Sequence, residues 1–155
     1  DRRFLDQPKN LRQFLDDGRE PDDRKLLDRK QRVETLARHG AAADAFESLR
    51  QGHRVTDLVP DTVCDGLRGT MGSINLELMQ AHRVQVLLVS DEETLAAMRL
   101  AWERLKVIIE PSCATVLAAV LRYPGHFAGR RVGLILSGGN VDLAALPWQL
   151  PPRTS

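Results

Sequence analysis

A serine, two glycines and an asparagine stand together at the end of the most apolar segment of the chain. The segment runs from Arg131 to Ser137 as Arg-Val-Gly-Leu-Ile-Leu-Ser, and Gly138, Gly139 and Asn140 follow at once. Apolar residues in such a continuous run predict a buried parallel strand. Ligands of parallel α/β sheets bind beyond the carboxyl ends of strands, where glycine lets backbone amides approach them. The four residues therefore predict a ligand-binding loop or a tight turn, and both interpretations stay open.

Two other polar positions stand where one predicted element gives way to the next. Asp65 precedes Gly66 after a short apolar stretch, and Glu110 precedes Pro111 between two helical patterns. On residue type alone, Asp65 and Gly66 form a plain turn and Glu110 is a charge at a helix end.

The elements that must position these residues alternate between strand and helix patterns. Val84 to Val89 is a short run of β-branched and leucine residues, which predicts a buried strand. Ser90 and Glu93 have the spacing of a capping box, so we expect a helix from there to about Lys106. Further helices are expected over 41–49, 73–82 and 113–121.

The composition of the 155-residue chain is that of a soluble globular domain. Lys and Arg number 22 against 21 Asp and Glu, so the charge gives no reason to expect a nucleic acid or an anionic membrane as partner. No apolar run is long enough for a membrane helix, and no signal-type segment opens the sequence, which favours a cytoplasmic location. Cys64 and Cys113 are too far apart for the usual zinc or redox spacing, so we expect reduced, structural thiols.

The texture of the sequence changes near Gly40. Residues 1–40 are rich in both basic and acidic side chains, and prolines interrupt any long helix, so we expect a charged arm that is helical or partly disordered. Residues 41–148 have the short periodic segments of a packed α/β region, and 149–155 form a short tail.

Four stretches resemble, in order and spacing, the signature segments of the pyridoxal-phosphate enzymes of the serine racemase and serine/threonine dehydratase family. They are 61–68 (Asp-Thr-Val-Cys-Asp-Gly-Leu-Arg), 89–93 (Val-Ser-Asp-Glu-Glu), 102–112 (Trp-Glu-Arg-Leu-Lys-Val-Ile-Ile-Glu-Pro-Ser) and 132–143 (Val-Gly-Leu-Ile-Leu-Ser-Gly-Gly-Asn-Val-Asp-Leu). The resemblance covers about 41–148, the C-terminal portion of the family. It implies an α/β, three-layer αβα fold, part of the large domain of the tryptophan synthase β-like fold (fold type II).

The resemblance also implies which residues bind pyridoxal 5′-phosphate. Ser137 matches the serine that hydrogen-bonds the pyridine nitrogen, and a neutral hydroxyl at that nitrogen tempers the electron sink of the ring. Gly138 and Gly139 belong to the same signature. Asp65 and Gly66 match the Asp-Gly of a loop that faces the cofactor, and Glu110 matches a glutamate close to the pyridine side of the binding site.

A nucleotide site is implied by two further positions. Lys106 and Asn140 match residues that, in animal serine racemases, contact an activating nucleotide at the dimer interface. On its own Lys106 is a surface or ion-pair lysine, and this second interpretation stays open.

A divalent-cation site is implied at Asp44, which matches an aspartate that helps to bind magnesium or calcium. Backbone carbonyls, such as that of Ala42, would complete the oxygen ligands that hard cations need. The sequence departs from the family here, because Ala43 replaces another aspartate and Arg38 the expected glutamate.

The catalytic residue of the family is a lysine that forms a Schiff base with the cofactor and moves the α-proton of the substrate. No lysine of this chain stands in the sequence context of that motif, and no glycine tetrad for the cofactor phosphate is recognisable, so the catalytic residue is unknown. We therefore expect an incomplete member of the family, arising by truncation, by a split gene or as a fragment.

The implied reaction is that of a serine/threonine ammonia-lyase (dehydratase), which yields a 2-oxo acid and ammonia, or of a serine racemase, which yields the other enantiomer. Serine, threonine and hydroxyaspartate all stay open as the small amino acid substrate. The expected partner is a second copy in a homodimer or a missing N-terminal half. The alternative function is a non-catalytic remnant that acts as an interaction module, since an uncovered half-domain exposes apolar edges that a partner must cover.

Overall fold

A computed structural model describes residues 35–39 and 43–148, with the backbone alone described over 35–39. The chain divides into two units, Asp1–Arg32 and Val33–Ser155, and every described residue belongs to the second. The predictions of a charged arm before Thr35 and of a tail over 149–155 lie outside the described residues.

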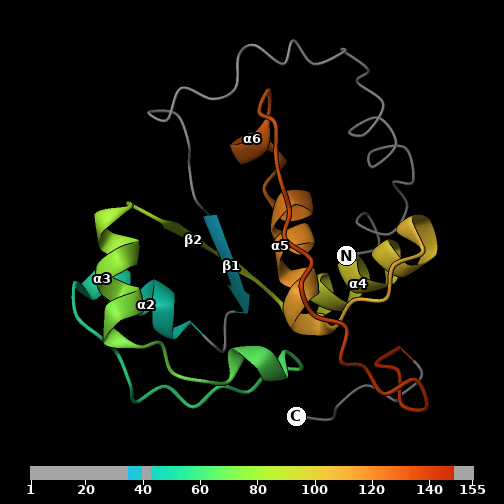
Figure 1. Ribbon diagram of the computed structural model, residues 1–155, viewed down its shortest axis with the longest axis horizontal. Helices are drawn as coiled ribbons and strands as arrows, with labels where there is room; N and C mark the ends of the chain where they lie inside the picture. The colour runs from blue at the N-terminus through green and yellow to red at the C-terminus, as the bar shows by residue number, and fades with distance from the viewer. Residues whose placement is uncertain (1–34, 40–42, 149–155) are drawn as a thin grey trace. The chain divides into compact units, whose positions relative to one another are not determined.

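Two parallel strands form the sheet of the described part (Figure 1). Strand β1 (Thr35–His39) pairs with β2 (Gln85–Val89) in a register that joins Thr35 to Gln85 and His39 to Val89. β2 confirms the strand predicted over 84–89. β1 lies on the N-terminal side of the expected boundary near Gly40, so the packed region begins earlier in the chain than the composition indicated. Its sequence, Thr-Leu-Ala-Arg-His, has no strong strand pattern, and pairing with β2 stabilises it.

The helices follow the predicted order, with ends within three residues of the predicted positions. They are α2 (Asp44–Gln51), α3 (Ser73–Ala81), α4 (Asp91–Leu105), α5 (Pro111–Arg122) and the short α6 (Pro124–Phe127), with a single 3-10 turn, η4 (Asp65–Leu67). Gly52 ends α2 in the left-handed conformation, at φ 76°, which glycine adopts without strain.

The start of α4 confirms the predicted capping box. The Ser90 hydroxyl accepts a hydrogen bond from the Glu93 amide at 3.2 Å, and the Glu93 carboxylate accepts one from the Ser90 amide at 2.8 Å. Both bonds satisfy backbone donors that a helix start leaves free. Because Ser90 directly follows β2, the cap fixes the angle at which the chain turns from the sheet into α4.

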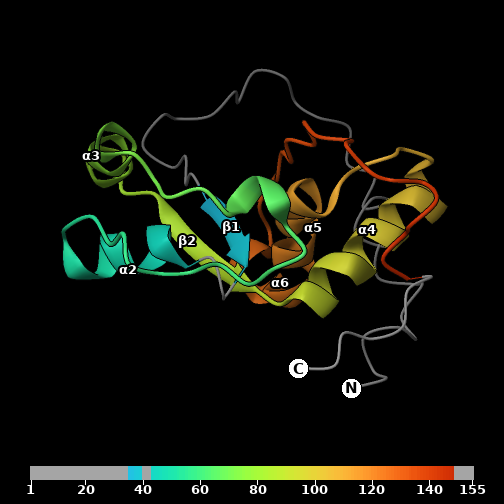
Figure 2. The ribbon, with the colours of Figure 1, turned by 90° about the horizontal axis from the view of Figure 1, so that it is seen from below.

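Alternate residues of β2 pack into two separate apolar clusters. Val86 contacts the cluster of Ala45, Met71 and Leu76 beside α2 and α3, whereas Leu87 and Val89 contact the larger cluster around Met98. The sheet therefore lies between α2 and α3 on one side and α4 and α5 on the other (Figure 2). This arrangement confirms the α/β class and the three αβα layers, here as part of a domain.

Alanines make the contact between α4 and α5 close. Ala97 and Ala101 of α4 and Ala114 and Ala118 of α5 are all fully buried in the larger cluster. Short side chains let the two helices approach each other, as predicted for the small-residue helix over 113–121. The helix pair forms a tightly packed support on which the polar loops at its ends are carried.

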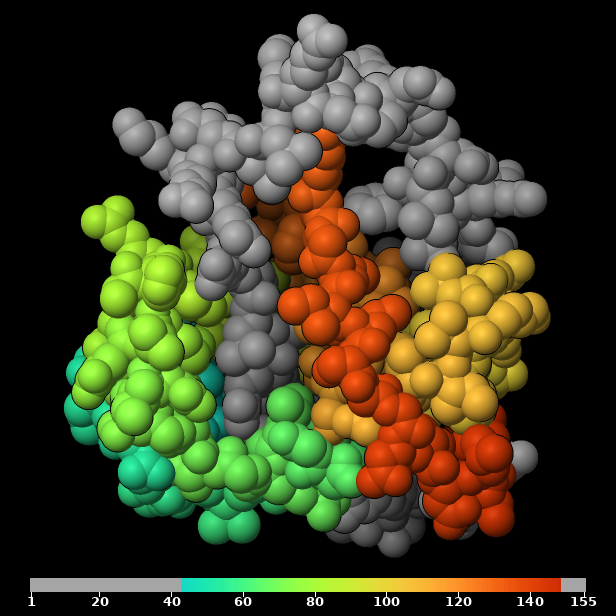
Figure 3. Space-filling view, in the orientation of Figure 1, coloured from blue at the N-terminus to red at the C-terminus, as the bar shows by residue number. Residues whose placement is uncertain are grey.

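The strand predicted over 131–137 is wrong for the chain as it stands. Residues 131–140 carry neither helix nor strand, and no strand pairs with them among the residues that the structure describes. Leu136 packs on the larger cluster, whereas Ile135 is 80% exposed. In Figure 3 the segment after α6, in orange, lies at the surface of the visible face. A strand needs a hydrogen-bonding neighbour, and the described part of the chain supplies none here.

Candidate active site

The centre of the candidate site is the carboxylate of Glu110, which stands directly before α5. Its Oε2 accepts a hydrogen bond from the Asn140 amide at 2.9 Å, and the Glu110 amide donates to the carbonyl of Gly138 at 3.0 Å. These two bonds join the loop at 138–140 to the start of α5. The side chain is partly buried, so the carboxylate is held at the edge of the site.

Glycine is required where the two loops approach this carboxylate. A Cβ atom on Gly138 would overlap the carboxyl group of Glu110, and one on Gly66 would lie 2.9 Å from the Ser112 hydroxyl and 3.7 Å from Glu110 Oε1. A Cβ atom on Gly139 would lie 3.1 Å from the carbonyl oxygen of Ile108. The glycines therefore permit a close approach of three backbone segments that any larger residue would widen.

The Asp65–Gly66 turn reaches the site through its amide. The Gly66 amide donates to Asp65 Oδ1 at 2.7 Å and to the Ser112 hydroxyl at 3.0 Å. Ser112 lies in the first turn of α5, two residues after Glu110. The turn and Glu110 are thus fixed to the same end of the same helix.

Five of the six residues predicted to bind the cofactor are brought together in this way: Asp65, Gly66, Glu110, Gly138 and Gly139. The sixth, Ser137, precedes Gly138 in the chain and is exposed, so its hydroxyl is accessible. Segments up to 75 residues apart in the sequence meet at this point, which a set of unrelated surface turns would not do. The assignment of cofactor contacts to these residues stays a prediction.

The two residues expected at a nucleotide site lie differently. Asn140 joins the candidate site through its backbone amide. Lys106 is exposed and ends α4 in the left-handed conformation, at φ 59°. The nucleotide site stays a prediction.

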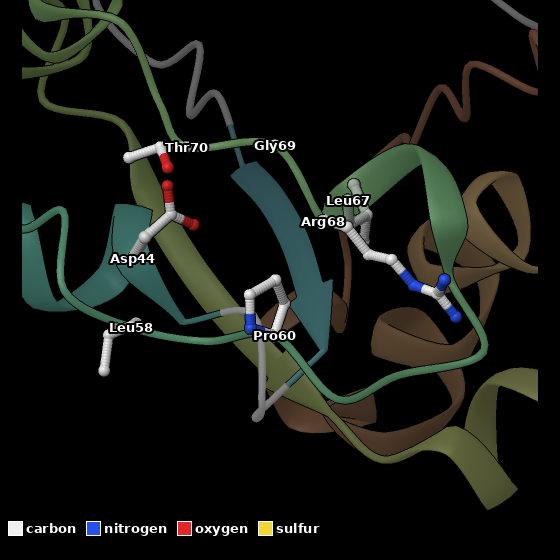
Figure 4. A pocket seen from close by; sticks show the side chains of 7 residues that line it. All are labelled: Asp44, Leu58, Pro60, Leu67, Arg68, Gly69 and Thr70. Carbon is white, nitrogen blue, oxygen red and sulfur yellow. The ribbon is translucent and has the colours of Figure 1, made fainter.

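Asp44 is 6% exposed and begins α2. Its Oδ2 accepts a hydrogen bond from the Met71 amide at 2.7 Å, and its carbonyl accepts one from the Ser48 hydroxyl at 2.5 Å. In Figure 4 the carboxylate points toward Thr70, and the Arg68 guanidinium points away from it.

The cavity beside Asp44 measures about 10 Å³, room for about one water molecule. It is lined by Asp44, Leu58, Pro60, Leu67, Arg68, Gly69 and Thr70. Ala42 lies outside the described residues. Across 43–148 no three His, Cys, Asp or Glu side chains gather as they would around a metal ion. The magnesium or calcium site stays a prediction.

Both cysteines are free and buried, as the sequence indicated. Burial raises the pKa of the Cys64 thiol from its ordinary value of 9.0 to about 11, so this thiol is neutral at physiological pH. A neutral buried thiol packs as a small apolar group beside the Asp65–Gly66 turn and is a poor nucleophile.

Two residues that the sequence interpretation left unassigned hold the main chain around the site. Ser112 was part of the recognised Glu-Pro-Ser stretch, and its position one turn into α5 was the available signal. The indole nitrogen of Trp102 donates to the carbonyl of Ile109 at 2.9 Å, directly before Glu110. The Trp102 ring also meets Trp148 edge to face, with ring centres 5.2 Å apart.

The arrangement suits a planar cofactor with polar groups at its rim. The close glycine contacts leave backbone and small hydroxyl groups at the surface of the site, and a single carboxylate stands beside them. Flat aromatic ligands with a ring nitrogen are bound by such sets of backbone contacts and one hydroxyl partner. The residues present therefore fit pyridoxal phosphate, with Ser137, Gly66 and Glu110 as the groups that would face its ring.

Comparison with curated proteins gives relatives that all belong to one kind of enzyme. The chain is 42% identical over 107 residues to the β-hydroxyaspartate dehydratase of Paracoccus denitrificans, which covers 69% of this chain and 34% of the relative. It is 42% identical over 109 residues to the serine racemase of Dictyostelium discoideum, with 68% and 34% covered. The chain thus spans about a third of the length of these relatives.

Solved structures agree with the sequence comparison. The crystal structure of the Dictyostelium discoideum serine racemase superposes with a TM-score of 0.65 at 40% identity, over 72% of this chain and 36% of that one. A bacterial threonine deaminase, from T.th., superposes with a TM-score of 0.66 at 35% identity, over 71% and 40%.

The family described as "Pyridoxal-phosphate dependent enzyme" matches residues 25–138 of the sequence. The match includes β1 and begins well before the boundary expected near Gly40, in agreement with the strand found there. It also contains the Asp65–Gly66 turn, Glu110 and Gly138, the residues that meet in the candidate site. Since the match covers most of the chain, this protein belongs to the family of pyridoxal-phosphate dependent enzymes.

Proposed function

We propose that this chain forms the C-terminal part of the cofactor site of a pyridoxal-phosphate dependent ammonia-lyase or racemase that acts on small hydroxy amino acids. The observation that carries the proposal is the meeting of three backbone segments around Glu110, with Gly66 and Gly138 in close approach. The relatives are named for serine, threonine and hydroxyaspartate, which share a hydroxyl group on the β-carbon.

Pyridoxal phosphate, when bound, supplies an electron sink for reactions at the α-carbon of an amino acid. In the proposed site, the hydroxyl of Ser137 hydrogen-bonds the pyridine nitrogen. A hydroxyl partner does not hold a proton on that nitrogen as a carboxylate would, which leaves a moderate electron sink. Glu110 stays oriented by the Asn140 amide, and the amide of Gly66 is already engaged by Ser112.

The proposed net reaction removes the α-proton and the β-hydroxyl of the amino acid. Hydrolysis of the product then gives a 2-oxo acid and ammonia, and the water lost in the first stage balances the water used in the second. Return of the proton to the opposite face of the α-carbon would instead give the other enantiomer. The base that moves this proton lies outside the residues assigned in this chain.

Partial coverage of the relatives and exposed apolar side chains both support a partner for this chain. Val59 is 88% exposed and Ile74 is 69% exposed, and Ile135 adds a third large apolar side chain at 80%. We propose that a complementary segment of the enzyme, or a second copy in a homodimer, covers such side chains in the cytoplasm. Within the described residues, no helix has the length and apolarity needed to cross a bilayer.

A non-catalytic interaction module remains the second candidate, and the same exposed side chains favour it. The two candidates differ in one respect. An enzyme part needs the Ser137 hydroxyl and the Glu110 carboxylate in the active complex, whereas an interaction module needs only the apolar surface.

The test is complementation. The 155-residue chain is mixed with the part of the Paracoccus denitrificans β-hydroxyaspartate dehydratase that it does not match, and with pyridoxal phosphate. Ammonia release from hydroxyaspartate, serine and threonine is then measured, together with the enantiomers of serine. Substitution S137A should lower the rate by about tenfold or more, the loss expected for one polar contact to the cofactor.

The control is S73A, which removes an exposed hydroxyl at the start of α3, away from the site. S73A should leave the rate unchanged. A complex that assembles and binds pyridoxal phosphate but converts none of the three amino acids would contradict the proposed reaction. Equal rates for S137A and the unsubstituted chain would contradict the role of Ser137.

A further inference from the structure

We infer that Thr62 and Asp91 are positioning residues that hold the Asp65–Gly66 turn at the proposed cofactor site. The inference rests on the proposed function for its meaning, because the turn matters only if a ligand binds beside it. Neither residue belongs to the predicted cofactor-binding set, and both are separated from Glu110 in the sequence.

The turn itself has little regular structure to fix it. Between Gly52 and Ser73 the single regular element is η4, three residues long, and both Asp65 and Gly66 are exposed. A short exposed turn without neighbours would sample many backbone conformations. Its position must therefore come from contacts with other elements.

The carboxylate of Asp91 provides the first of these contacts. The hydroxyl of Thr62 donates to Asp91 Oδ1 at 2.7 Å, and the amide of Val63 donates to both carboxylate oxygens, at 3.3 and 3.2 Å. Asp91 is the first residue of α4, where the partial positive charge of the helix start favours a carboxylate. Hydrogen bonds to an ionised acceptor are stronger than those between neutral groups.

Thr62 passes this anchor on to the turn. Its side chain is fully buried, and its hydroxyl oxygen also accepts a hydrogen bond from the Cys64 amide at 3.1 Å. The Thr62 carbonyl accepts two bonds from the guanidinium of Arg68, at 3.2 and 2.8 Å. Thr62 therefore binds the chain on both sides of Asp65 and Gly66, and closes the turn as a loop.

A second anchor holds the far side of the same turn. The Ser112 hydroxyl accepts the bond from the Gly66 amide at the start of α5. The turn is thus fixed to the first residues of two helices, α4 through Asp91 and α5 through Ser112, and these helices are locked together by their buried alanines. The pair of anchors sets the separation between Gly66 and Glu110, and hence the width of the proposed cofactor site.

The simpler role for Asp91 is to stabilise the start of α4, and variants separate the two roles. Substitution T62V removes the hydroxyl that links the turn to Asp91 and leaves α4 unchanged, while T62S retains the hydroxyl. Substitution E92Q removes another acidic charge from the same first turn of α4 as a matched control. D91N is the direct variant, and the threonine pair supplies the answer if D91N does not fold.

The first readout is amide hydrogen exchange in the full 155-residue chain. We expect T62V and D91N to accelerate exchange at Val63 and Gly66 by about tenfold, the effect of losing one charge-assisted bond, with little change at Ala97 inside α4. T62S should restore the slow exchange, and E92Q should leave it unchanged. Equal exchange at Gly66 in T62V and the unsubstituted chain, or a parallel acceleration at Ala97, would overturn the inference.

The second readout is the affinity of the complemented enzyme for pyridoxal phosphate, measured by the absorbance of the bound cofactor. T62V should weaken binding by about tenfold and T62S should restore it, whereas a purely structural effect on α4 would not follow the hydroxyl. If the unsubstituted complex binds no cofactor, the proposed function fails, and the exchange data alone then decide whether the two residues hold the turn.

Discussion

Substitution G138A tests the close approach of the loop at 138–140 to Glu110. A methyl group at this position would overlap the Glu110 carboxyl group. The backbone at Gly138 does not have a positive φ, so alanine meets no conformational strain there and the effect comes from the contact alone. Because the carboxylate is the mobile end of a partly exposed side chain, it can swing away at the expense of the bond from the Asn140 amide.

The expected loss of stability follows from these two contributions. Breaking the Asn140–Glu110 bond costs about 1 kcal/mol, and residual crowding adds a fraction of the roughly 1–3 kcal/mol that is usual for overpacking. G138A should therefore lower the free energy of unfolding of the chain by about 1.5 kcal/mol, as measured by urea denaturation. The shifted carboxylate should also weaken pyridoxal phosphate binding in the complemented enzyme.

Gly133 provides the matched control in the same segment. A Cβ atom there meets nothing within 4 Å, so G133A should be neutral or should stabilise the chain slightly by restricting the unfolded state. The double variant E110A/G138A removes the group that the methyl would meet, and the two substitutions should couple by about 1 kcal/mol. Equal stabilities of G138A and G133A, or additive effects of E110A and G138A, would refute the reasoning.

Two further predictions concern the frame of the site. S90A removes the hydroxyl of the capping box and should lower the thermal stability of the chain by about 1 kcal/mol, followed by far-UV circular dichroism; a melting temperature equal to that of the unsubstituted chain would count against the cap. The raised pKa of Cys64 contributes stability that is fully present below pH 9 and is lost as the pH rises toward 11, because only the unfolded thiol ionises readily in that range. The urea midpoint should therefore fall between these pH values, and C64A should fall less; equal falls in both proteins would assign the change to other groups.

The features that the sequence predicted well are those whose cause is local. The capping box needs only Ser90 and Glu93, three residues apart, and the strand at 84–89 is defined by its own run of apolar residues. The helix over 113–121 is likewise set by its alanines and by the preceding proline. These elements were found within three residues of their predicted ends because their neighbours in sequence are also their partners in space.

The features that were missed depend on partners far away in the chain. Residues 131–137 have a strong strand pattern, yet a strand forms only where another strand offers its backbone groups. Thr35–His39 shows the reverse, since a weak pattern becomes a strand through pairing with β2. The bond between Thr62 and Asp91 spans 29 residues, and no spacing rule in the sequence could indicate it.

The edge-to-face pair of Trp102 and Trp148 gives this protein a built-in optical signal. These are the two tryptophans of the sequence, and they join α4 to the segment that follows the candidate site. Indole rings at this separation couple electronically, so their near-ultraviolet circular dichroism should report whether that segment is docked. Because Trp102 also holds the main chain before Glu110, the same signal should follow the assembly of the site in real time, without any added label.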